Sequence, residues 1–237
     1  MLAIKRTAAL LVLLLILITT GGCQKMSEKS MITTAEEALR AKYDESFNAV
    51  ETRAIDDECF YAWLRPSTRP DIIIRAEMNN DGTALSDNYI VKKICHEISD
   101  KVELLMKDYS GDYYVFTKNI LEYTIDESLD TTPQKHLEDN PEDRFDIVVF
   151  IAAEGADAAA LHNAIAEIKN LGITNGSINP IVISAKEMSI LQGEIESIDD
   201  LNSDIVHEIM VDGRRMLIDL SAAEVPAIDE LRKELGI

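Results

Sequence analysis

A long amphipathic segment near the middle of the chain is the feature that most restricts its fold. Apolar residues recur there at every third or fourth position, namely Ile90, Ile94, Ile98, Val102 and Leu105. This spacing places them on one face of a helix, which we expect over residues 87–107. A helix with a single apolar face must bury it against another layer, so the flanking segments have to supply that layer.

The flanking segments are rich in β-branched and aromatic residues, which predicts strands. The expected strands cover residues 47–54, 59–64, 71–78, 113–117, 145–152 and 181–183. Asp212-Gly213 is a strong turn signal, and it predicts a hairpin between residues 205–211 and 214–220.

Three further helices are expected among these strands. Capping boxes that begin at Thr34 and Ser221 predict helices over residues 35–44 and 222–235. Apolar periodicity predicts a third helix over residues 157–171. The chain therefore belongs to the α+β class.

An acidic stretch over residues 126–144 interrupts the periodic pattern. It contains Pro133, Pro141 and many Asp and Glu residues, which a core could not bury unpaired. We interpret it as a linker or long loop between two small modules of mixed helix and antiparallel sheet, over residues 31–125 and 145–237.

The charge of the chain excludes one large class of partners. The 43 acidic residues outnumber the 23 basic ones, which gives a net charge of −20. Such a surface repels nucleic-acid phosphates, and no basic stripe offsets this repulsion, so we expect no DNA or RNA partner. It also repels anionic lipid headgroups, so attachment to a membrane would need something other than electrostatics.

The N-terminus has the layout of an export signal. Lys5 and Arg6 precede an apolar run over residues 8–18, and two glycines and Cys23 follow. A membrane-spanning helix needs about 20 apolar residues, so this run is too short to be one. The order of charged, apolar and small residues is typical of a signal peptide.

The segment Thr20-Gly21-Gly22-Cys23 resembles the lipobox of bacterial lipoproteins, although Thr20 stands where that family usually has Leu. The resemblance implies a signal peptide over residues 1–22 and acyl chains such as palmitate on Cys23, which becomes the mature N-terminus. Residues 23–30 would then be the lipidated cysteine and a polar tether, and the protein would be lipid-anchored at the extracytoplasmic face of the cell membrane. The alternatives are an ordinary signal peptide cut at Gly21 or Gly22, and a retained membrane anchor.

Two other cysteines, Cys59 and Cys95, form a candidate disulfide, because an extracytoplasmic compartment permits one. The alternative is two small buried side chains that do not pair. The four histidines, His96, His136, His162 and His207, form no His-x-x-x-His pair, so we expect no metal site.

The sequence contains no nucleophile, phosphate-binding or dinucleotide-binding motif, so we name no catalytic residue and no cofactor. The leading hypothesis is a binding or protein-interaction module at the cell envelope, with a protein or small molecule as its partner. Aromatic residues at 60–63 and 109–116 would suit such contacts if exposed, or they alternate into the core. The other hypotheses are an envelope enzyme with an unfamiliar active site and a small solute-binding receptor.

Overall fold

The described part of the computed structural model contains two β-sheets and six helices, which confirms the α+β class. It describes residues 27–56, 58–79, 81, 84–119, 128–194, 209 and 213–237. The lipobox, including Cys23, lies outside the described residues. No helix among the described residues is both long and apolar enough to cross a membrane.

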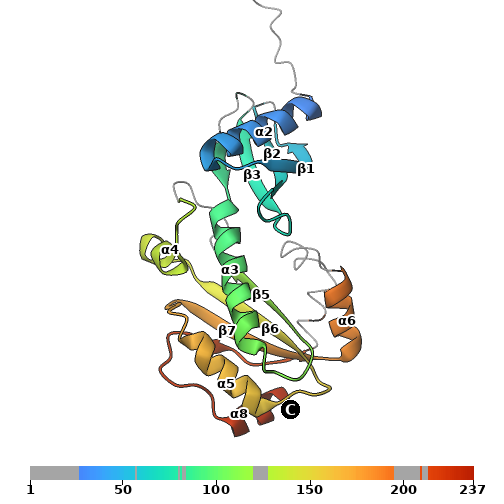
Figure 1. The fold of residues 1–237 in the computed structure, drawn as a ribbon, viewed down its shortest axis with the longest axis vertical. Coiled ribbons are helices and arrows are strands. Elements are labelled where there is room, and N and C mark those ends of the chain that lie inside the picture. The colour runs from blue at the N-terminus through green and yellow to red at the C-terminus, as the bar shows by residue number, and fades with distance from the viewer. Residues whose placement is uncertain are drawn as a thin grey trace, which may run out of the picture.

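The first sheet, called sheet A here, is a four-stranded antiparallel sheet with strand order β1-β2-β3-β4. Its strands are β1 (Phe47–Ala54), β2 (Cys59–Pro66), β3 (Ile74–Asn79) and β4 (Ala84–Asp87). Helix α2 (Glu28–Tyr43) covers one face of it (Figure 1) and contributes Leu39 and Tyr43 to the core.

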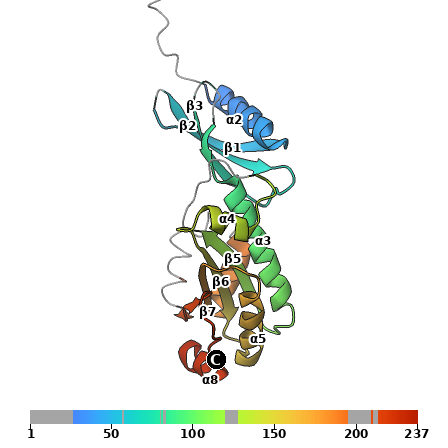
Figure 2. The same cartoon turned by 90° about the vertical axis from the view of Figure 1, so that its left-hand side faces the viewer.

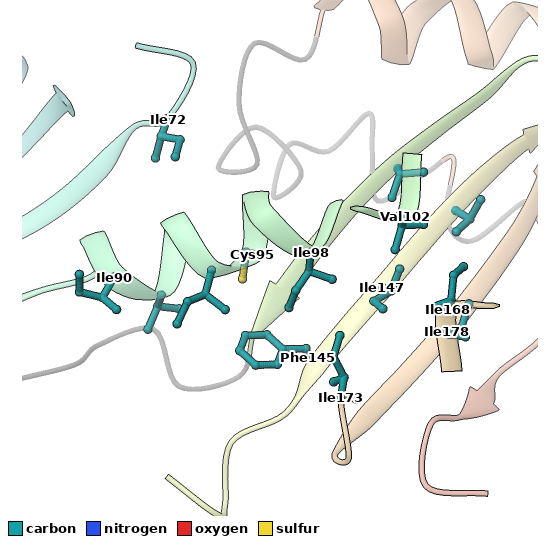
Figure 3. Close-up of a cluster of buried hydrophobic side chains, with 14 of the residues drawn as sticks. Ile72, Ile90, Cys95, Ile98, Val102, Phe145, Ile147, Ile168, Ile173 and Ile178 are labelled. Carbon is teal, nitrogen blue, oxygen red and sulfur yellow. The ribbon is translucent and has the colours of Figure 1, made fainter. Parts of the chain in front are cut away.

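Helix α3 (Tyr89–Met106) extends from sheet A and lies along the second sheet, as both views show (Figures 1 and 2). Its buried face contains Ile90, Ile94, Ile98 and Val102, as the apolar spacing predicts. Figure 3 shows Ile72 of the first half of the molecule near one end of this helix, and Phe145 and Ile147 of the second half along the remainder.

The second sheet, sheet B, has strand order β5-β6-β7-β8, with β9 also paired to β7. Its strands are β5 (Tyr113–Asn119), β6 (Phe145–Ala152), β7 (Gly176–Ile183), β8 (Arg214–Arg215) and β9 (Ile218–Asp219). The β6–β7 pair is parallel and the other pairs are antiparallel. All eight residues of β6 are buried, as expected for a central strand with both faces covered.

Helices cover both faces of sheet B. Helices α3 and α5 (Ala158–Lys169) lie on one face, and α6 (Ala185–Glu194) lies on the other (Figures 1 and 2). Helix α8 (Ile228–Leu235) packs beside α5, and the short α4 (Pro133–Asp139) precedes β6.

One hydrophobic cluster extends through both halves of the protein. It includes Leu39 of α2, Phe60 of β2, Ile94 of α3, Ile147 of β6 and Ile165 of α5. A second, smaller cluster lies beneath α6 on the opposite face of sheet B. Helix α3 therefore belongs to the core of both sheets.

This core differs from the expected division at residues 126–144. Strand β5 precedes that stretch and β6 follows it, yet the two strands pair along their whole length, with Val115 opposite Val149. Part of the stretch forms α4, whose Pro133 and Leu137 are buried. The boundary between the two sheets therefore falls along α3.

Several expected helix ends also differ from the structure. Thr34 lies inside α2, which begins at Glu28 and is capped by the Ser27 hydroxyl, so the polar tether is shorter than residues 23–30. Ser221 does not cap α8, which begins at Ile228. Strands β8 and β9 both pair with β7, while residues 205–208 and 210–212 of the expected hairpin lie outside the described residues.

Candidate functional site

The face of sheet A away from α2 carries the candidate functional surface. Side chains alternate across a strand, and in β2 the side chains of Phe60, Ala62 and Leu64 enter the core. Tyr61 and Trp63 therefore point to the opposite face. We call this surface the aromatic face and define it by Glu51, Arg53, Tyr61, Trp63, Arg75 and Glu77.

The two aromatic rings are held by their neighbours on the sheet. The centroids of Tyr61 and Trp63 are 6.0 Å apart, with ring planes at 64°. The Arg75 guanidinium lies over the Tyr61 ring, 5.3 Å from its centroid. Edge contacts and cation–π contacts of this kind fix ring orientation. Both rings are half-buried, and among the described residues neither packs against either hydrophobic cluster.

The strand register places each ring between two opposite charges. Tyr61 is opposite Arg53 on β1 and opposite Glu77 on β3. Trp63 is opposite Glu51 on β1 and Arg75 on β3. Directly opposite residues have Cβ atoms about 4.5–5.5 Å apart, so each ring has a guanidinium and a carboxylate as neighbours.

This arrangement suits recognition. A guanidinium only donates hydrogen bonds and an ionised carboxylate only accepts them, so each row offers both functions beside an aromatic ring. Trp, Tyr and Arg are also the residue types enriched at binding hot spots.

The two cysteines considered as a disulfide are both free in the structure. The Sγ atom of Cys59 lies 3.4 Å from Oδ1 of Asn79, whereas Cys95 is buried on α3 (Figure 3). Burial raises the pKa of Cys95 to about 12, and partial burial followed by the negative charge of Asp56 raises the pKa of Cys59. The thiolate is the reactive form, so these raised pKa values disfavour either thiol as a nucleophile at neutral pH.

A buried polar cluster joins α4 to the end of sheet B. Nε2 of His136 lies 2.6 Å from Oδ2 of Asp143, and both side chains are completely buried. The same oxygen accepts a hydrogen bond of 3.0 Å from Nδ2 of Asn119. A His–Asp pair occurs in many catalytic sites, but these side chains have no exposed surface through which a substrate could reach them. The cluster therefore anchors α4.

A second polar cluster surrounds Arg69, in the loop between β2 and β3. Its guanidinium pairs with Asp71 at 2.9 Å and with Asp100 of α3 at 3.4 Å. The hydrogen bond from Arg69 lowers the pKa of Asp71, and burial followed by the charge of Arg69 lowers the pKa of His96. These contacts fasten the loop to α3.

The remaining histidines and acidic groups do not assemble into a site. Nδ1 of His162 donates to the carbonyl of Pro226 at 2.9 Å, and His207 lies outside the described residues. Across the described part of the chain, no group of three or more His, Cys, Asp or Glu side chains is placed to hold a metal ion.

The two aromatic stretches of the sequence each contain buried and half-buried rings. In the second stretch, Tyr109 and Phe116 are buried, and the half-buried Tyr113 and Tyr114 pack against the hydrophobic clusters. In the first, Phe60 is buried while Tyr61 and Trp63 lie on the outer face. Arg65 lies on the same side of β2 as Tyr61 and Trp63, because side chains alternate along the strand. This charged residue indicates that the side is the outer one.

Comparisons with known proteins give a similar fold but no information on the site. No protein-family model matches the chain, and no curated protein matches it. The fold is similar to the crystal structure of a DUF5037 family protein from Ruminococcus gnavus ATCC 29149, with a TM-score of 0.65. The match covers 87% of this chain and 99% of that chain at 12% identity, so the likeness concerns the fold alone.

Proposed function

We propose that the mature protein is a lipid-anchored binding protein of the extracytoplasmic membrane face, and that the aromatic face is its binding surface. The observation that carries the proposal is the placement of Tyr61 and Trp63. Both rings lie outside the hydrophobic clusters and are flanked by charged side chains. Surface aromatic residues supported in this way are suited to bury area against a partner.

The proposed anchor would hold sheet A close to the membrane. Only residues 24–27 separate Cys23 from the first residue of α2, and an extended chain spans at most about 3.6 Å per residue. The start of α2 would then lie within about 18 Å of the lipidated residue. Because α2 packs on sheet A, the aromatic face would meet components of the envelope near the membrane surface.

The anchor can be tested by following processing. Globomycin, an inhibitor of the lipoprotein signal peptidase, should cause a larger precursor to accumulate. Cys23→Ala should release the protein or leave it uncleaved. A Cys23→Ala protein of normal size that stays in the membrane fraction would overturn the anchoring proposal.

The binding surface can be tested separately from the anchor. In the Cys23→Ala background, the released protein should co-sediment with isolated envelope material from the producing cells. Trp63→Ala and Tyr61→Ala should each lower the bound fraction about tenfold, as expected for hot-spot residues. Leu104→Ala is the matched control, because Leu104 is 68% exposed but lies on α3. Equal binding by all these variants would show that the aromatic face is not the binding surface.

A further inference from the structure

We infer that the ligand of the aromatic face is an uncharged polysaccharide chain. This inference rests on the proposed binding role of that face. It comes from the pattern of charges around the two rings, which differs from that of the chain as a whole.

The first step is the balance of charge within each row of the sheet. The row through Tyr61 contains Arg53 and Glu77, and the row through Trp63 contains Glu51 and Arg75. Each row therefore has no net charge. A polyanion would meet a carboxylate beside each ring, and a polycation would meet a guanidinium.

The second step is the long-range field. The whole chain carries −20, and loss of Lys5 and Arg6 with the signal peptide would bring it to −22. This field repels anionic polymers, including phosphate polymers and acidic glycans. The same field attracts cationic polymers, and these are disfavoured only by the guanidinium beside each ring. A neutral ligand is indifferent to the field and matches the balanced rows.

The third step is hydrogen-bonding chemistry. A sugar hydroxyl both donates and accepts, so neighbouring hydroxyls can accept from a guanidinium and donate to a carboxylate. The C–H face of a sugar ring is apolar. It can cover the aromatic ring that lies between the guanidinium and the carboxylate of each row. Both rows offer this combination at adjacent positions, with the order of guanidinium and carboxylate across the sheet reversed between them.

The fourth step separates a glycan from a protein partner. The buried centre of a protein interface is mostly apolar. The outer positions of β2 and β3 carry no aliphatic side chain; they are Cys59, Tyr61, Trp63, Arg65, Arg75, Glu77 and Asn79. Their only large apolar groups are the two aromatic rings. On β1, Val50 adds one exposed aliphatic side chain, 55% exposed, beside Glu51. This small aliphatic share favours a polyhydroxylated ligand.

The experiment uses the full chain purified in detergent, with fluorescence as its readout. Trp63 is the single tryptophan of the chain, so its emission reports directly on the aromatic face. The probes are isolated envelope material, the same material digested with proteinase K, and a panel of neutral glycans (mannan, laminarin and oligomers of glucose and of N-acetylglucosamine). Polygalacturonate serves as the acidic comparison.

We expect digested envelope material and at least one neutral glycan to shift the emission of Trp63, and polygalacturonate to leave it unchanged. The apparent Kd should change less than about twofold between low and high salt, because screening acts on charged ligands. Arg75→Gln and Glu77→Gln should each weaken binding about tenfold, the loss expected when one charged hydrogen bond is removed. Arg40→Gln and Glu37→Gln are matched controls on exposed positions of α2, and they should bind as the wild type does.

The outcomes separate the two proposals. If undigested envelope material shifts the emission but digested material does not, the binding surface stands and the glycan inference is overturned. Binding that weakens more than about tenfold with salt would identify a charged ligand and also overturn it. The absence of a shift with every neutral glycan would do the same. If no envelope preparation shifts the emission, both proposals fail.

Discussion

Removal of the Asp143 carboxylate should destabilise the fold far more than removal of the exposed carboxylate beside it. Oδ2 of Asp143 accepts from Nε2 of His136 at 2.6 Å and from Nδ2 of Asn119 at 3.0 Å. Oδ1 accepts from the backbone N–H of Arg144 at 2.8 Å. Asp143→Ala deprives three donors of this acceptor at a site where both Asp143 and His136 are shielded from water.

The size of the effect follows from burial. A buried donor that loses its acceptor costs about 1–3 kcal/mol, and Asp143→Ala takes this acceptor from three donors. We therefore expect Asp143→Ala to lower the free energy of unfolding by about 3–5 kcal/mol, out of a total of about 5–15 kcal/mol for a typical protein. Asp143→Asn keeps the volume and one acceptor oxygen, so its cost should be smaller.

The matched control is Glu142→Ala, an exposed neighbour that should change the free energy of unfolding by less than about 0.5 kcal/mol. Urea denaturation of the chain from residue 24 onward measures both variants, followed by far-ultraviolet circular dichroism and by Trp63 fluorescence. The two signals should change together, because one hydrophobic cluster joins both sheets. If Asp143→Ala falls within about 1 kcal/mol of Glu142→Ala, the buried cluster does not anchor α4 as argued.

Two further predictions concern α3. Ile94→Ala should lower the free energy of unfolding by about 2–5 kcal/mol because the side chain is fully buried, whereas Lys101→Ala on the exposed side should lower it by less than about 0.5 kcal/mol. Equal losses in urea denaturation would show that the apolar face is misassigned. The pKa of His96 lies below its ordinary value of 6.5 because of burial and then the charge of Arg69. The unfolded chain therefore binds more protons than the folded one, and stability is lost as pH falls below about 6.5. His96→Gln should reduce this loss between about pH 7 and about pH 5, and a curve parallel to that of the wild type would contradict the assignment.

The elements that follow from local pattern could be predicted from the sequence. The strand over residues 47–54 has the bounds of β1, and the helix over residues 87–107 differs by two residues at its start and one at its end from α3. Partner choice could not be predicted, because the residues of β5 favour a strand whichever neighbour that strand pairs with. Helix α6 was missed because, among its described side chains, Met188 and Leu191 are the ones buried in the core, too few to set up a period.

The aromatic face could be predicted only in part from the sequence. Alternation along β2 shows that Phe60 and Tyr61 point to opposite faces, but it does not say which face is covered. The covering layer is α2, and its position depends on packing between distant segments. Arg65 was the available signal, because a guanidinium at an alternate position favours the open face for Tyr61 and Trp63.

The aromatic face depends on the second half of the protein through α3. Among the described residues, one face of sheet A is covered, and α2 alone does not complete its core, since Ile72, Ile90 and Ile94 belong to the same cluster. The C-terminal half of α3 is fixed in turn by β5 and α5. A substitution that loosens sheet B therefore loosens the helix that supports sheet A, and it should lower the fraction of molecules whose binding surface is formed. Two sheets with one shared core thus give a small, single-sided sheet the rigidity that a preorganised binding surface requires.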